Sequence, residues 1–256
     1  LIFSWINHRV LFRQRWGYKR GKQTPEAFMK YEKDVVEPIY ESLKAELINK
    51  KIHEPISILS YFPCISHDNK LYIFDKKYHF NNLEEAKNVP PLEEAIKVME
   101  FPRQRRKPFR CIADFFASDR LDVVGLTLAS AGLKISDYER EFYNKGEFTK
   151  YYQVHGLGVE LAEALAEVLH KQIRLDLNIV PKEGHKLSDV QMKQYVGCRY
   201  SPGYAACPEL SQNRDIFDLL NPEEFGIELS ETFQMHPEQT TCAIVIHNKE
   251  ANYYNV

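Results

Sequence analysis

The sequence predicts an α+β fold with a mainly antiparallel, twisted sheet flanked by helices. Two observations favour it: the β-rich segments arrive as hairpins, and they do not alternate regularly with helices as a doubly wound parallel sheet requires. The chain has 256 residues, of which 44% are hydrophobic and 27% charged, so a substantial core is available. The sequence contains no internal repeat and no low-complexity segment.

A long helix is expected to begin at Thr24-Pro25. A hydroxyl side chain at the N-cap, followed by proline at the first helical position, is a typical helix start. Apolar residues then recur at helical spacing, namely Phe28, Tyr31, Val35, Ile39, Leu43 and Leu47. Because Pro38 lacks a backbone donor, we expect a kink there.

A β-hairpin is expected after this helix. Residues 56–62 and 71–74 are rich in β-branched and aromatic side chains, and the turn-forming cluster 66–69 separates them. Further along, residues 122–131 predict a buried strand that ends at Gly132.

Helices dominate the next part of the chain. A long helical region is expected from Ser136 to Arg174, with an interruption at residues 155–158, where two glycines stand close together. Its second half carries an apolar face with helical periodicity. Short helices are expected at residues 188–195 and 215–220.

The chain is expected to end in a second hairpin. Residues 241–247 predict a strand, and Tyr253-Tyr254 predict a partner strand that is cut short. The first residue is Leu1 rather than methionine, so a fragment of a longer polypeptide is one interpretation and a chain lacking its ends is another.

Charge and cysteine content exclude several classes of protein. A formal net charge of -2 gives no global attraction to nucleic acid or an anionic membrane. No apolar run approaches the roughly 20 residues that span a bilayer. The five cysteines are odd in number, far apart and without a Cys-x-x-Cys pair, which argues against a disulfide framework or a thiolate zinc site. We therefore expect a cytoplasmic protein.

Two basic clusters stand out locally. The first, interleaved with Phe12, Trp16 and Tyr18, comprises Arg9, Arg13, Arg15, Lys19, Arg20 and Lys22, and the second comprises Arg103, Arg105, Arg106, Lys107 and Arg110. Basic residues mixed with aromatic ones suit a nucleic-acid surface, a solvated face or a surface for an acidic protein. The near-neutral net charge favours the solvated face, and we expect no nucleic-acid partner.

Candidates for catalytic or metal chemistry are weak. His170, His185, His236 and His247 are scattered without metal-ligand spacing, so no metal site is expected. There is no glycine-rich phosphate loop. Cys207 stands between alanine and proline with no evident base, which is typical of a small buried residue rather than a nucleophile. We assign no catalytic residue.

The most informative stretch of the sequence is Arg199-Tyr200-Ser201-Pro202-Gly203-Tyr204-Ala205-Ala206-Cys207-Pro208-Glu209. An arginine presents a planar fork of donors that matches a carboxylate. The small residues that follow leave the backbone uncovered, so that its polar groups can reach a flat heterocycle. Asp114 and Glu163 stand among apolar neighbours, where a cationic partner would offset the cost of burying an acid.

This stretch resembles the S-adenosylmethionine-binding loop of the activation domain of cobalamin-dependent methionine synthase. The similarity spans about Arg110 to Tyr254. It implies a single C-shaped domain from residue 24 to 256, preceded by a basic and aromatic segment or linker at residues 1–23.

The resemblance also implies roles for individual residues. Asp114 and Arg199 would hold the amino acid end of the ligand, and Glu163 would face the sulfonium. The backbone of Gly203, Tyr204, Ala205 and Ala206 would line the adenosyl part, and Tyr253 with Tyr254 would close the site.

The implied function is reactivation within a methyltransferase of methionine biosynthesis. The module would bind S-adenosylmethionine and support the reductive methylation of cob(II)alamin, with the cobalamin held by another domain or subunit. A flavodoxin-type protein would supply the electron.

Three positions depart from the family pattern: Leu210 replaces a histidine after Pro-Glu, Lys193 stands where an acid would help a cation, and Val159 occupies a position that can carry aspartate. They leave open an alternative, a non-enzymatic scaffold that binds a corrinoid protein or an acidic partner and no longer binds S-adenosylmethionine.

Overall fold

The computed structural model describes residues 2–179 and 195–256, and the chain divides into two compact units. The first unit comprises residues 1–57, 129–168 and 236–241, and the second comprises residues 58–128, 169–235 and 242–256. Four elements contain residues of both units: β1 (Ile56–His67), β4 (Asp122–Ser130), α6 (Phe148–Asp176) and β8 (Thr240–Ile246). The helix expected at residues 188–195 lies almost wholly outside the described residues.

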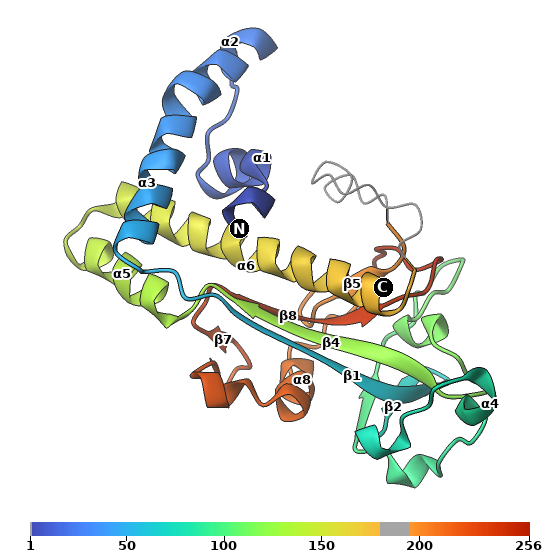
Figure 1. Cartoon of the computed structure of the whole chain (residues 1–256). Coiled ribbons are helices and arrows are strands. Elements are labelled where there is room, and N and C mark those ends of the chain that lie inside the picture. The colour runs from blue at the N-terminus through green and yellow to red at the C-terminus, as the bar shows by residue number, and fades with distance from the viewer. Residues whose placement is uncertain (1, 180–194) are drawn as a thin grey trace. The chain divides into compact units, whose positions relative to one another are not determined.

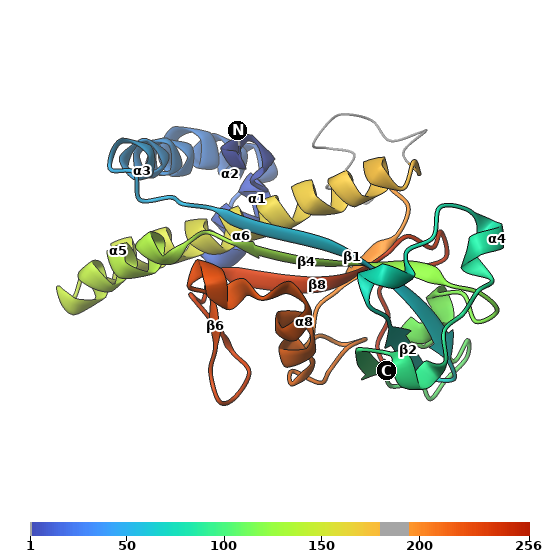
Figure 2. The ribbon, with the colours of Figure 1, turned by 60° about the horizontal axis from the view of Figure 1, so that its bottom comes forward.

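A six-stranded sheet forms the centre of the fold. Its strand order is β3-β2-β1-β4-β8-β5, and the remaining strands are β2 (Lys70–Ile73), β3 (Lys97–Glu100) and β5 (Cys198–Tyr200). The pairs β1–β2, β2–β3 and β5–β8 are antiparallel. The central strands run side by side in both ribbon views (Figure 1; Figure 2). The predicted α+β class with an antiparallel sheet is confirmed.

The first hairpin was predicted correctly, and β1 is longer than expected. In the ladder His67 pairs with Lys70, so two residues make the turn. One of them, Asp68, adopts a left-handed conformation with φ of 53°, which aspartate tolerates better than most residues. The third strand, β3, was not predicted.

In the first unit, the N-terminal helix begins as predicted. The Thr24 side chain accepts a hydrogen bond from Ala27 N, and α2 (Pro25–Tyr31) follows. A π-helical turn (Glu32–Val36) then leads into α3 (Glu37–Asn49). The proline ring of Pro38 would clash with the carbonyl four residues earlier in a regular helix, so the wider turn there accommodates it.

The residues before this helix pack into the core of the first unit. Short helical pieces occupy Ile2–Trp5, His8–Val10 (α1) and Leu11–Arg15. Ile6, Leu11 and Phe12 are buried against α3 side chains. Two arginines of the first basic cluster are paired, Arg13 with Glu32 at 2.7 Å and Arg15 with Glu160 at 2.9 Å.

The interruption expected at residues 155–158 is wrong, because α6 runs through it. The chain instead breaks at Gly146 (φ 75°), between α5 (Leu133–Asn144) and α6. A Cβ atom on Gly156 would lie 2.9 Å from Trp16 Cδ1, and one on Gly158 would lie 2.8 Å from Gln239 Cγ. Both glycines serve close packing of the helix rather than its termination.

In the second unit, helices cover both faces of the sheet (Figure 2). The last turns of α6 pack on one face, where a Cβ on Gly125 would meet Ile173 Cδ1 at 2.9 Å and Val245 Cβ at 3.6 Å. Helix α8 (Gln212–Leu220) lies on the other, where Cys242 Sγ donates to Asn213 Oδ1 at 3.2 Å. These two faces are called the α6 face and the α8 face below.

The remaining elements of the second unit are short. They are α4 (Leu83–Ala86) and the strand pair β6 (Glu228–Leu229) and β7 (Met235–His236), whose last residue falls in the first unit. The terminal hairpin predicted at Tyr253-Tyr254 is wrong, since residues 247–256, all described, form no strand. Among the described residues, no helix combines the length and apolar character that a bilayer crossing requires.

Candidate functional site

The site predicted from the sequence begins at β5, one of the two edge strands of the sheet. In its ladder with β8, Arg199 stands opposite Val245 and Tyr200 opposite Ile244. Side chains alternate along a strand, and directly paired residues share a face. Arg199 therefore leaves the sheet on the α6 face with Val245, and Tyr200 leaves it on the α8 face.

The turn after β5 is closed by its own backbone. Gly203 N donates to Cys207 O at 2.8 Å, and Cys207 N donates to Tyr204 O at 2.9 Å. Gly203 has φ of 89°, and a Cβ there would also meet Leu210 Cδ1 at 3.0 Å, so glycine suits this position. Gly203, Tyr204 and Ala205 are exposed, whereas Ala206 is buried. The turn thus exposes two small residues and one tyrosine to solvent.

Cys207 anchors this turn to the second unit. Its Sγ donates to Gln212 Oε1 at 2.9 Å, and Gln212 Nε2 donates to Glu100 O at 2.7 Å. Burial, with a smaller contribution from Glu209, raises the pKa of the Cys207 thiol to about 12. A thiol with this pKa is protonated near neutral pH, so the residue acts in packing and not as a nucleophile.

An aromatic cluster lies on the α8 face. Tyr200 contacts Tyr253 and Tyr254, with ring centroids 5.9 and 6.1 Å apart, and stacks on Phe115 at 6.3 Å. Burial raises the pKa of Tyr200 and of Tyr254. The structure therefore brings together the terminal tyrosines and the residue that follows Arg199.

The C-terminal segment is held by side-chain hydrogen bonds in place of a strand. Tyr200 Oη donates to Asn252 O at 2.6 Å, and Cys198 Sγ donates to Ala251 O at 3.3 Å. Asn248 Nδ2 donates to Phe115 O at 3.1 Å. These contacts fix Tyr253 and Tyr254 beside β5.

Asp114 lies in a 3₁₀ turn (Ile112–Phe115) and is paired with Arg103. Arg103 Nη1 and Nη2 donate to its two carboxylate oxygens at 2.6 and 2.7 Å, and Cys111 N donates to Oδ2 at 3.0 Å. Asp114 and Arg103 are close enough to Tyr254 to influence its pKa. The acid thus lies beside the aromatic cluster.

Arg199 lies near other basic groups on the α6 face. His170 is buried in α6, and burial, Arg174 and Arg199 together lower its pKa well below the usual value. The Arg174 guanidinium lies over the Tyr195 ring, 4.2 Å from its centroid. Asp114 lies beside the aromatic cluster, whereas Arg199 leaves β5 on the α6 face. The joint grip of one zwitterion by Arg199 and Asp114 stays a prediction.

The other predicted residues are distributed as follows. Glu163 is half-buried on the part of α6 that belongs to the first unit, as is Val159. Leu210 contacts the turn near Gly203, and Lys193 lies outside the described residues. Within residues 2–179 and 195–256, no group of three or more His, Cys, Asp or Glu side chains could hold a metal ion.

Sequence reasoning missed two members of this arrangement. Arg103 had been grouped with a basic surface cluster, although its spacing from Asp114 across a turn was a usable signal. Tyr200 is the hub of the aromatic cluster, and its alternation with Arg199 on a strand could have been anticipated.

The fold and the site together define a class of protein: an α+β module that presents an arginine-led turn of small residues at the edge of an antiparallel sheet. The chain belongs to the family described as the activation domain of vitamin B12-dependent methionine synthase, whose family model matches residues 29–256. This match extends across both compact units.

Individual relatives agree with this assignment. The methionine synthase of Mycobacterium tuberculosis is 34% identical over 271 aligned positions, and that of Mycobacterium leprae is 32% identical over 272. The alignments cover 98% and 99% of this chain but 21% of each relative, so the chain spans about a fifth of their length. A crystal structure of the MetH reactivation domain bound to AdoHcy shares the fold, with a TM-score of 0.81, 23% identity, and coverage of 99% of this chain and 77% of that one.

Proposed function

We infer that this chain binds S-adenosylmethionine and serves as the reactivation module of a cobalamin-dependent methionine synthase. Family membership over residues 29–256 is the observation that carries the proposal. The AdoHcy of the solved structure is what S-adenosylmethionine becomes once its methyl group has left, which supports the same ligand class for this chain.

The cobalamin held by another domain, once one electron has reduced it from cob(II)alamin, would supply the acceptor for the methyl group of S-adenosylmethionine, which would leave as S-adenosylhomocysteine. The residues of this chain contribute binding and orientation, which convert a rare encounter into a local one. No side-chain base is required for the transfer.

The residues around β5 suit parts of the ligand. The exposed turn at Gly203, Tyr204 and Ala205 would offer backbone to the adenosyl group, and Tyr253 on the C-terminal segment contacts Tyr200, which precedes this turn. A carboxylate is best matched by a guanidinium, and we assign this contact to Arg199.

Asp114 is assigned to bind the ligand ammonium, although most of the acceptor sites of its carboxylate are already used. A carboxylate has about four acceptor sites. Three are used by Arg103 and Cys111, so one remains for a ligand. Glu163 is assigned to the sulfonium side, as the family resemblance implies.

Two partners complete the proposal. The cobalamin-binding domain or subunit would present its corrin to this module, and a flavodoxin-type protein would supply the electron, with basic side chains such as Arg105 and Arg106 as a surface for an acidic donor. The five buried cysteines are all free thiols, as suits a reducing cytoplasm.

Calorimetry of S-adenosylmethionine binding tests the proposal. Arg199→Ala should weaken binding by roughly tenfold or more, since a charged hydrogen bond contributes about 1.5–3 kcal/mol. Tyr204→Ala, in the exposed turn, should weaken it several-fold without changing thermal stability. Arg120→Ala is the matched control, because Arg120 is an exposed arginine paired with Asp119.

The outcomes separate the two readings of the sequence. If the folded wild-type chain shows no saturable binding, the reactivation role is wrong and the non-enzymatic scaffold is favoured. If Arg199→Ala and Arg120→Ala bind equally well, Arg199 loses its assigned role while the ligand class stands.

A further inference from the structure

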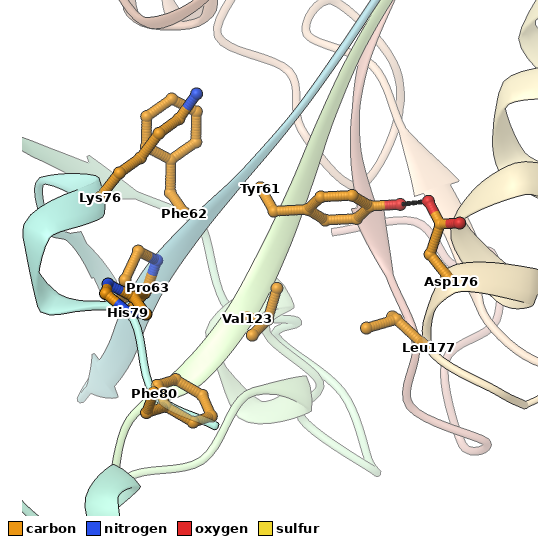
Figure 3. A pocket seen from close by; sticks show the side chains of 9 residues that line it. All are labelled: Tyr61, Phe62, Pro63, Lys76, His79, Phe80, Val123, Asp176 and Leu177. Atoms are coloured by element: carbon orange, nitrogen blue, oxygen red, sulfur yellow. Dashed lines mark hydrogen bonds between the residues drawn. The ribbon is translucent and has the colours of Figure 1, made fainter. Parts of the chain in front are cut away.

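The second unit contains a cavity that plays no part in the proposed reaction. Its volume is about 380 Å³, within the range of small-molecule sites. Nine residues line it, all from the second unit: Tyr61, Phe62, Pro63, Lys76, His79, Phe80, Val123, Asp176 and Leu177. Figure 3 shows their side chains around a common space.

The fold brings this cavity together from four segments. Tyr61 on β1 and Val123 on β4 point toward the same space from neighbouring strands (Figure 3). Val123 is two residues from Gly125 and so shares the α6 face. Asp176 and Leu177 close one side at the C-terminal end of α6, and the segment around Lys76 closes the other.

Aromatic rings dominate the lining. Tyr61, Phe62 and Phe80 all line the cavity, but Tyr61 and Phe62 are neighbours on β1 and point in opposite directions (Figure 3). Pro63 and Leu177 add apolar surface. Flat ring systems bury large area against such walls and gain further from stacked or edge contacts. The cavity therefore favours a planar ligand over a branched aliphatic one.

The two charged groups that line the cavity, the Asp176 carboxylate and the Lys76 ammonium, differ in their partners. Asp176 accepts hydrogen bonds from Tyr61 Oη at 2.5 Å and from Gln172 Nε2 at 2.7 Å. The Lys76 ammonium lies 4.9 Å from the Phe62 ring centroid, and among the described residues no carboxylate forms an ion pair with it. His79 also lines the cavity and lies next to Pro63 (Figure 3).

This asymmetry defines the ligand chemistry. The cation at Lys76, held over an aromatic wall, can pair with an anion that enters the cavity. The carboxylate of Asp176 disfavours a second negative charge at the far end. We propose that this cavity is a binding site for a planar aromatic molecule with a single carboxylate, with the carboxylate at Lys76 and the ring between Phe80 and Leu177.

The test uses 2-naphthoate as the probe and the 256-residue chain. Calorimetry should show saturable one-to-one binding, and the methyl resonances of Val123 and Leu177 should shift during the titration. Lys76→Met keeps the apolar stem but removes the charge, so binding should weaken about tenfold. Phe80→Ala should weaken it as well.

Lys77→Met is the matched control. Lys77 is the next residue, is also exposed, lies over the Tyr78 ring and does not line the cavity. The affinity of the Lys77→Met variant for 2-naphthoate should equal that of the wild type. The neutral amide 2-naphthamide should bind the wild type about as weakly as 2-naphthoate binds the Lys76→Met variant.

The proposal is overturned by any of three results: no saturable binding, equal affinity in Lys76→Met and the wild type, or an equal loss in Lys76→Met and Lys77→Met. Binding without shifts at Val123 and Leu177 would also overturn it, because the probe would then occupy another place. None of these results bears on S-adenosylmethionine binding, which involves other residues.

Discussion

Arg103 holds the carboxylate of Asp114 with both terminal nitrogens, at 2.6 and 2.7 Å. The side chains are 36% and 41% exposed, so the pair is neither buried nor fully solvated. The Asp114 carboxylate, which we assign to bind the ligand ammonium, is thus already paired with a cation of the protein, Arg103. This relationship decides how variants at the two positions should differ.

We expect Asp114→Asn to weaken S-adenosylmethionine binding about tenfold, because a charge-assisted contact to the ammonium is lost. Arg103→Met should cost about 1 kcal/mol of stability, as a partly exposed ion pair does. It should not weaken ligand binding, since it leaves Asp114 free to pair with the ligand. Calorimetry and urea unfolding measure the two effects.

Asp119→Asn is the control, because Asp119 is an exposed acid paired with Arg120. A drop in affinity for Arg103→Met as large as for Asp114→Asn would mean that the pair only shapes the turn.

Glu46 is the acid of a charged network in the first unit. It accepts hydrogen bonds from Lys150 at 2.6 Å, Lys50 at 2.9 Å and Tyr138. Partial burial acts to raise its pKa, but these hydrogen bonds outweigh burial and lower the pKa to about 2. A carboxyl with a depressed pKa stabilises the folded state above its unfolded pKa and loses that effect as the pH falls.

Glu46→Gln should therefore lower the free energy of unfolding by about 2 kcal/mol at pH 7. The difference from the wild type should shrink as the pH falls from about 4.5 towards 2. Urea unfolding at several pH values measures it, with Glu41→Gln as a surface control paired with Lys44. A difference that stays constant down to pH 2.5 would contradict the assignment.

Two histidines should respond to pH in opposite directions. The hydrogen bond with Glu139 raises the pKa of His155, whereas burial, with Arg174 and Arg199, lowers that of His170. The stabilisation from His155 is complete below its unfolded pKa of about 6.5 and disappears as the pH rises through its folded pKa. The stabilisation from His170 is present above about 6.5 and disappears as the pH falls.

Histidine ring proton shifts followed by NMR should show one group that titrates above pH 6.5 and one that stays neutral well below it. His155→Gln should remove the first signal and destabilise the protein more at pH 6 than at pH 8.5. Equal destabilisation at both pH values would refute the role of the charged form.

The start of β5 depends on Gly197, which has φ of 92° and would place a Cβ 2.2 Å from Ile246 O. Gly197→Ala should destabilise the protein by more than 2 kcal/mol, because a backbone atom blocks the methyl group and the conformation is strained. Gly146→Ala is the matched control, with φ of 75° and nothing within 4 Å of its Cβ. It should cost about 1 kcal/mol. Thermal unfolding compares the two, and equal losses would show that strain alone matters.

Local signals in the sequence predicted the elements whose cause is local. Thr24-Pro25 marked a helix start through its own side chain and ring, and the cluster at residues 66–69 marked a turn. The helix break predicted at Gly156 and Gly158 is wrong, because these glycines pack against Trp16 and Gln239, which are distant in sequence.

In the site, too, the features that depend on local sequence could be predicted and those that depend on distant residues could not. Arg199 and the small-residue turn follow from residue types, as does the exposure of Gly203. The partner of Asp114 does not, since it depends on how the chain folds back at Phe109, whose carbonyl also accepts from Arg103 at 2.8 Å. The terminal tyrosines contact Tyr200 and were predicted wrongly as a strand, because side chains such as Asn248 hold this segment in place of a ladder.

The three-residue length of β5 makes the chain around it intolerant of insertions. Deleting or adding one residue between Gly197 and Arg199 would move each β5 side chain to the opposite face of the sheet. The Arg199 guanidinium would then enter the aromatic cluster on the α8 face, and Tyr200 would meet α6. A change of equal size between β6 and β7 would alter an exposed loop. Natural relatives that keep the proposed function should therefore vary in length between β6 and β7, and hardly at all between Gly197 and Arg199.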